Sequence, residues 1–92
     1  MSGHVFHPGH HQLHGITVVV DASGGRTYVG RFDRAEDGKV LLLNVAVHDP
    51  SGAARDEFLG RSHKFGVKVD LKHLAIPEAE ISGIVPLADL AP

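Results

Sequence analysis

Eight histidines stand in this chain of 92 residues, and five of them fall within its first fourteen positions. Imidazole is the commonest side-chain ligand for zinc, copper and nickel, and spacings of three or four residues can bring two rings together. The candidate metal ligands are His4, His7, His10, His11 and His14. Three interpretations of this block stay open: a solvated tail without function, a weak site for zinc or nickel, and a defined metal site repeated in an oligomer.

Basic side chains form a second candidate group, concentrated between positions 55 and 75. The whole chain has nine Lys and Arg against eleven Asp and Glu, and this net charge of −2 argues against a broadly basic nucleic-acid binder. The local excess is typical either of ordinary solvated surface or of a face that binds an anion or a nucleic acid. Candidate residues for that face are Arg61, His63, Lys64, Lys68, Lys72 and His73.

Signatures of catalysis are absent from the sequence. The chain has no cysteine, and no serine lies in a Gly-x-Ser-x-Gly elbow. There is no phosphate-binding loop and no dinucleotide fingerprint. His48 precedes an aspartate, but metal phosphohydrolases need further, distant ligands, so we assign this histidine to the surface or to an interface. We therefore expect no enzyme activity, no catalytic residue, and no cofactor apart from the zinc or nickel considered above.

Runs rich in β-branched and apolar residues must position these side chains. Strands are predicted over residues 16–21, 27–33, 39–48, 66–76 and 80–85. Tight turns are predicted at Ser23-Gly24-Gly25 and at Glu36-Asp37-Gly38. Because Pro8-Gly9 would break a helix, an N-terminal helix can cover at most residues 10–14. The polar stretch 53–65 has room for one or two helical turns near residues 53–59.

Two features of these strands bear on packing. The second strand carries Gly30 where a strongly bent strand needs a glycine. The first and third strands are apolar on both faces, which one small barrel cannot cover, so neighbouring subunits are expected to cover the second face. Four of the five Phe and Tyr side chains are assigned to the core, which leaves no pair for base stacking. These aromatic residues are Tyr28, Phe32, Phe58 and Phe65.

Taken together, these runs resemble the Sm-like family, which includes LSm and Hfq proteins. The resemblance lies in the bent second strand from Tyr28 to Phe32, the long third strand, the variable excursion and the segment from Ala75 to Ile84. It spans residues 16–87. It implies a mainly β, strongly bent five-stranded antiparallel barrel whose fourth and fifth strands pair between subunits in rings of about five to eight copies.

The sequence departs from the family pattern at two places that matter for RNA binding. Members that bind uridine-rich RNA usually carry Asp-x-x-Asn after the second strand and a basic Arg-Gly step between the fourth and fifth. Here the first loop has Asp33, Glu36 and Asp37 but no asparagine, and Ile76-Pro77-Glu78 has no basic residue. This pattern argues against RNA binding in the usual central-pore mode and leaves the basic segment as the candidate face.

We therefore divide the chain into a His-rich segment (1–15), an Sm-like or SH3-like barrel (16–87) and a tail (88–92). The first hypothesis is a non-enzymatic homo-oligomeric ring that binds RNA or another anionic ligand. The alternatives are an SH3-like protein-interaction module and a metal-binding protein that uses the N-terminal histidines. Without a signal peptide or a membrane-length apolar run, we expect a cytoplasmic location and no membrane partner.

Overall fold

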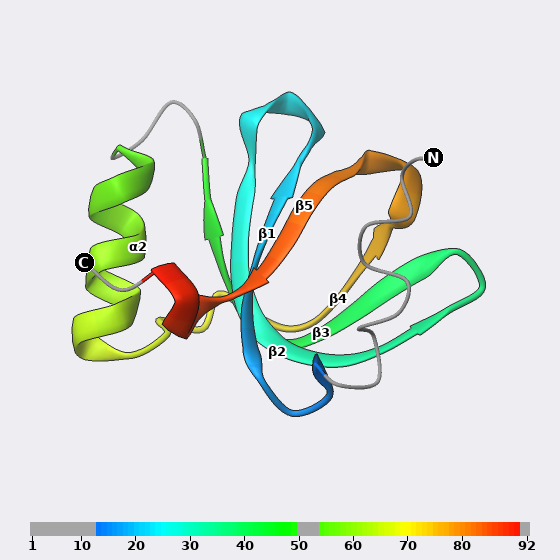
Figure 1. Cartoon of the computed structure of the whole chain (residues 1–92), viewed down its shortest axis with the longest axis horizontal. Coiled ribbons are helices and arrows are strands. Elements are labelled where there is room, and N and C mark those ends of the chain that lie inside the picture. Colours follow the sequence, from blue (N-terminus) through cyan, green and yellow to red (C-terminus); the bar gives the residue numbers. More distant parts are fainter. Residues whose placement is uncertain (1–12, 50–53, 91–92) are drawn as a thin grey trace.

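The computed structural model describes residues 13–49 and 54–90, and in these residues five strands form one antiparallel sheet (Figure 1). The strand order is β4-β3-β2-β1-β5. The strands are β1 (Thr17–Ala22), β2 (Thr27–Glu36), β3 (Lys39–His48), β4 (Leu71–Pro77) and β5 (Ile81–Pro86). The helix α2 (Arg55–Phe65) and the short 3-10 helices η1 (Ser23–Gly25), η2 (Glu78–Glu80) and η3 (Leu87–Leu90) complete these elements. The predicted mainly β, five-stranded antiparallel fold is confirmed.

The bend of the sheet is centred on Gly30 of β2, as predicted. The β2–β3 register shifts there, and Asn44 on the opposing strand takes a left-handed φ of 53°. A Cβ atom at Gly30 would lie 2.9 Å from Cγ2 of Val45 and 3.1 Å from the carbonyl oxygen of Leu43. Only a glycine lets the two bent strands approach this closely.

The turn between β2 and β3 is the predicted Asp-Gly turn. Asp37 and Gly38 both have positive φ angles, of 54° and 73°. Two consecutive residues of this kind match the right-handed twist of the flanking strands in a tight hairpin.

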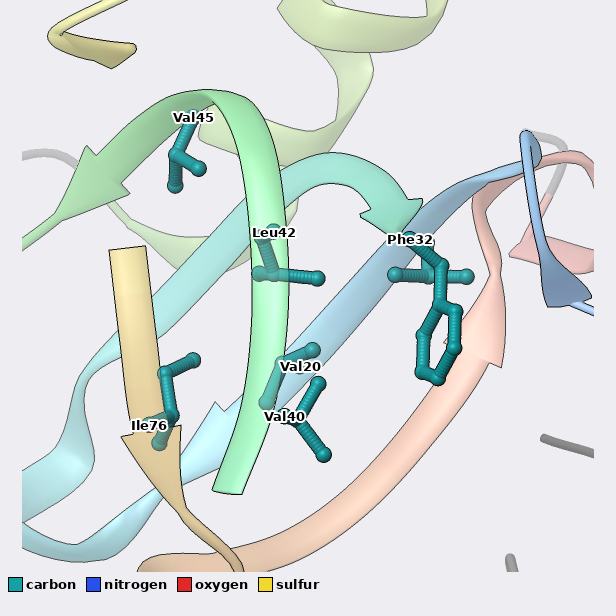
Figure 2. Close-up of a cluster of buried hydrophobic side chains, with 7 residues drawn as sticks. Val20, Phe32, Val40, Leu42, Val45 and Ile76 are labelled. Carbon is teal, nitrogen blue, oxygen red and sulfur yellow. The ribbon is translucent and has the colours of Figure 1, made fainter. Parts of the chain in front are cut away.

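The main core lies inside the curve of the sheet (Figure 2). Phe32 and Leu42 are its largest fully buried side chains, and Leu13, before β1, packs against the same cluster. The buried members of this core are Val18, Val20, Phe32, Val40, Leu42, Val45 and Ile76.

A second core lies on the other face of the sheet. Val19 of β1 and Val29 of β2 pack there with Leu59 of α2 and Leu87 of η3. In Figure 1, α2 and η3 lie together at the left of the sheet. The expectation that a neighbouring subunit covers the second face of the first strand is therefore wrong, because the chain covers that face with its own helix.

Three predicted elements need correction. The second strand, predicted to end at residue 33, continues to Glu36. The helical turns near residues 53–59 are the start of an eleven-residue helix, α2. The fourth strand begins only at Leu71, since residues 66–70 have no regular structure. Gly66 ends α2 with a φ of 88°. After it, Val47 N donates a hydrogen bond of 2.9 Å to the side-chain Oδ2 of Asp70 instead of to a main-chain carbonyl oxygen. Val69, which alternation placed in this strand, is 48% exposed just before it.

His48 also differs from its prediction. It is 7% exposed, and its ring lies 5.0 Å from that of Phe58, between centroids. The histidine at the end of β3 is therefore part of the contact between the sheet and α2, and it does not lie on the surface.

No helix within residues 13–49 and 54–90 is long and apolar enough to cross a membrane.

Candidate functional site

The structure places the six predicted basic and histidine residues in two groups, all of them exposed. The first group lies on the second half of α2 and in the segment after it. Its members are Arg61, His63, Lys64 and Lys68. The second group consists of Lys72 and His73 on β4. The basic segment of the sequence therefore contributes side chains to two separate parts of the protein surface.

The first group borders two neighbouring surface depressions that share Arg61. One depression, of about 520 Å³, is lined by the α2 residues Arg61, His63, Lys64 and Phe65, together with Glu57 and Gly60. The other, of about 280 Å³, brings Arg61 together with Lys68. Folding therefore brings four of the six candidates together, and we call Arg61, His63, Lys64, Phe65 and Lys68 the α2 surface.

The charge of the α2 surface is moderately positive. Arg61 faces Glu57 across 3.9 Å, but both side chains are more than half exposed, so water screens this pair and the guanidinium stays available. Asp70 adds a carboxylate at the edge, where it holds the amide of Val47. Arg61, Lys64 and Lys68 together outweigh these two carboxylates.

The second group is less suited to an anion. His73 lines a depression of about 260 Å³ with Asp33 and Arg34. Arg34 is paired with Asp33 at 3.1 Å and with Glu36 at 3.0 Å. The hydrogen bond to Glu36, followed by its charge, raises the pKa of Arg34. Since Arg34 already has two carboxylate partners, the β4 group adds only Lys72 and His73 as basic side chains, with the carboxylate of Asp33 in the same depression as His73.

Phe65 is the residue that sequence reasoning assigned wrongly. The sequence interpretation places it in the core together with Tyr28, Phe32 and Phe58. In the structure its side chain is 77% exposed in the last turn of α2. The ammonium nitrogen of Lys64 lies 5.3 Å from the centre of the Phe65 ring. The polar sequence of α2 after Leu59 is the signal that could have revealed this exposure.

The opposite end of the barrel is acidic. The β2–β3 turn and η2 touch there, since Glu78 N donates to the carbonyl oxygen of Gly38 at 2.9 Å. Figure 1 shows both connections at the right, away from α2. The acidic residues of these two connections and of the end of β2 are Asp33, Glu36, Asp37, Glu78 and Glu80. The two connections therefore lie together through a main-chain hydrogen bond, and both carry carboxylates.

Of the five N-terminal histidines, only His14 falls within the described residues. His4, His7, His10 and His11, and nearly all of the predicted 10–14 helix, lie outside them. His14 is exposed, and its Nδ1 contacts the main-chain oxygen of Asp33. In the described part of the chain, no group of three His, Cys, Asp or Glu side chains is placed to hold a metal ion.

Comparisons with known proteins give matches in structure only. No protein-family model matches the sequence, and no protein of curated function is significantly similar to it. Among solved structures, the chain is similar to the Sm protein of Pyrococcus abyssii in complex with a uridine heptamer, with a TM-score of 0.59 and 16% identity. That alignment covers 83% of this chain and 89% of the archaeal one.

Two further structures agree with this match. An Sm-like archaeal protein from Pyrobaculum aerophilum aligns with a TM-score of 0.56 and 17% identity, over 83% of this chain and 46% of that one. A chain of the NatC complex bound to CoA aligns with a TM-score of 0.59 and 14% identity, over 87% and 90%. The barrel described here is therefore an Sm-like fold. The expected resemblance is confirmed at the level of fold.

Proposed function

We propose that this protein is a non-enzymatic, homo-oligomeric Sm-like ring that binds RNA or another polyanion on its α2 surface. The observation that carries the ring is the sheet order β4-β3-β2-β1-β5, in which β4 and β5 each have one strand partner within the described chain. An open sheet edge is a template for pairing with another chain. When β4 of one copy pairs with β5 of the next, every edge is satisfied and the assembly closes.

Apolar side chains along these two edges support the same proposal. Leu71 on β4 is 41% exposed, and Val85 on β5 is 37% exposed. β4 also carries Lys72 and Pro77, which are residues of the kind that protect a free edge, so the support comes from the apolar positions alone. Here the apolar side chains would gain burial at a junction between subunits.

The choice of the α2 surface for the ligand follows from charge. The Pyrococcus abyssii relative was solved with a uridine heptamer, which makes RNA the first ligand to test. In this chain the two connecting loops at the far end of the barrel carry carboxylates, which repel phosphate. The α2 surface holds Arg61, Lys64 and Lys68 together, and a ring would repeat it at every subunit.

Light scattering coupled to size-exclusion chromatography tests the ring. We expect a single species larger than a dimer at micromolar concentration. A monomer would overturn the ring and favour the SH3-like alternative, in which the free β4 edge takes up a strand from a different protein.

Fluorescence anisotropy with labelled oligouridine tests the ligand. We expect binding that weakens steeply between low and physiological salt, because the contacts are mainly with phosphates. Absence of binding to both RNA and polyphosphate at low salt would overturn the polyanion site while leaving the ring untouched.

A further inference from the structure

We infer that Phe65 is the base-stacking platform of a single-stranded nucleic-acid site on the α2 surface. This inference rests on the proposed polyanion surface and specifies its ligand. It assigns to Phe65 a role that the loops of the barrel do not fill, since those loops present carboxylates.

The aromatic ring of Phe65 is exposed to solvent. Phe65 is 77% exposed, the largest value among the exposed large hydrophobic residues in the described chain. It belongs to neither buried cluster, so burial in the protomer does not account for an aromatic residue here. A lone exposed apolar residue is common on protein surfaces. The neighbours of Phe65 are what set it apart.

Phe65 has basic side chains as neighbours. Lys64 Nζ lies 5.3 Å from the ring centre, and Arg61 and His63 line the same depression. Lys68 joins them through the depression that shares Arg61. Proteins that bind single strands combine these two parts, cations that follow the phosphates and an aromatic face on which bases stack.

A single strand fits this surface better than a duplex or an apolar protein partner does. In a duplex the base faces are already stacked and cannot reach Phe65, whereas an unpaired strand can offer one. An apolar protein partner would strip water from the surrounding ammonium and guanidinium groups without pairing them, which is costly. A single-stranded nucleic acid can stack a base on the Phe65 ring while its phosphates pair with the surrounding cations.

Substitutions at Phe65 in the full chain test the inference. Phe65→Leu keeps an apolar side chain but removes the aromatic face, and Phe65→Tyr keeps that face. We expect Phe65→Leu to weaken binding of single-stranded oligouridine by about 5- to 100-fold, the loss of one stacked base, while Phe65→Tyr binds like the parent. Binding of inorganic polyphosphate should be the same for all three proteins.

Tryptophan fluorescence can report directly on stacking of a base against the side chain at position 65. The chain contains no tryptophan, so Phe65→Trp introduces one fluorophore at the platform. We expect oligouridine and single-stranded DNA to quench its emission at saturation, and polyphosphate to leave the emission unchanged. Circular dichroism of each variant checks that the fold is retained, which the exposure of Phe65 predicts.

The outcomes separate this inference from the proposed function. Equal oligouridine affinity for the parent and Phe65→Leu would overturn the stacking role while the polyanion surface stands. Parallel weakening of polyphosphate and oligouridine would also overturn it, since the change would then act through charge or fold. Tight binding of an apolar peptide that Phe65→Leu retains would assign the surface to a protein partner. Failure of every polyanion to bind would overturn both the stacking role and the polyanion surface, and it would leave the proposed ring assembly untouched.

Discussion

Asp21, near the end of β1, and Arg55, the first residue of α2, form a two-point ion pair between the sheet and the helix. Arg55 Nη2 lies 2.8 Å from Oδ2 and its Nε lies 3.0 Å from Oδ1. Hydrogen bonding to Asp21 is the main cause that raises the pKa of Arg55. Asp21 Oδ1 also accepts a hydrogen bond from the hydroxyl of Thr27 at 2.9 Å. One carboxylate therefore joins β1, the start of β2 and α2.

Substitutions at Asp21 should separate its two roles. Asp21→Asn removes the charge but keeps an oxygen that accepts the hydrogen bond from Thr27. Since both side chains of the ion pair are more than one-third exposed, we expect the free energy of unfolding to fall by at most about 1 kcal/mol. Asp21→Ala also removes the acceptor for Thr27, which is 2% exposed, and should cost about 1–3 kcal/mol more. Urea denaturation measures both values. Equal losses would show that the Thr27 hydrogen bond contributes nothing.

Two glycines offer a matched test of the bend. Gly30→Ala places a methyl group 2.9 Å from a Val45 side-chain carbon, and overpacking of this kind should cost about 1–3 kcal/mol. The new methyl group of Gly60→Ala in α2 has no atom within 4 Å, so the higher helix propensity of alanine should raise the free energy of unfolding by about 0.5–1 kcal/mol. Thermal melts of the two variants should shift in opposite directions. A stable Gly30→Ala variant would mean that β2 and β3 can separate at the bend without cost.

Edge substitutions should dissolve the proposed ring without unfolding the barrel. Leu71→Glu on β4 and Val85→Glu on β5 place a carboxylate where the neighbouring copy would pack. Leu90→Glu on η3 is the control, because Leu90 is 37% exposed, like Val85, and lies off both edges. Light scattering should report monomers for the two edge variants and the parent mass for the control. Loss of assembly in the control would indicate a subunit junction elsewhere.

Salt dependence should locate the phosphate-binding side chains. Replacing Lys64 and Lys68 together by glutamine should lower the slope of log affinity against log salt by about one for each phosphate that is no longer neutralised. Lys39→Gln is the control, since this exposed lysine follows the β2–β3 turn at the acidic end of the barrel. Equal slopes for the parent and the double variant would indicate that RNA binds at a surface other than the proposed one on α2.

Zinc or nickel binding should depend on the histidine block. The described residues contain no three-ligand group, so calorimetry should lose any metal signal when His4, His7, His10 and His11 are changed to alanine. Protons compete for imidazole, so the affinity of the parent should fall below about pH 6.5. Metal binding that survives the four substitutions would require ligands in another part of the chain.

Sequence patterns predicted the sheet well because its determinants are local. The Asp37-Gly38 turn and the third strand, with its bounds at Lys39 and His48, appear as predicted. Gly30 stands at the bend because a side chain there would meet Val45. Each of these depends on residues close in sequence or on a single steric contact.

The errors concern contacts between distant segments. The second apolar face of β1 indicated a neighbouring subunit, but Val19 packs against Leu59 and Leu87, 40 and 68 positions further along the chain. Phe65 was assigned to the core by its residue type, which does not show where the core ends. The basic segment was found, but only the fold could show that Lys68 joins Arg61 while Lys72 and His73 lie on β4.

The pairing of β1 with both β2 and β5 has a consequence for synthesis of the chain. Val19 lies opposite Val29 on one side and opposite Val85 on the other. A nascent chain can form the β1–β2 hairpin early, but β1 stays an open apolar edge until residues 81–86 have left the ribosome. Contacts of such long sequence separation slow folding, and an exposed edge promotes aggregation in the interval. Chains stalled before β5 should therefore be the form of this protein that most needs chaperones.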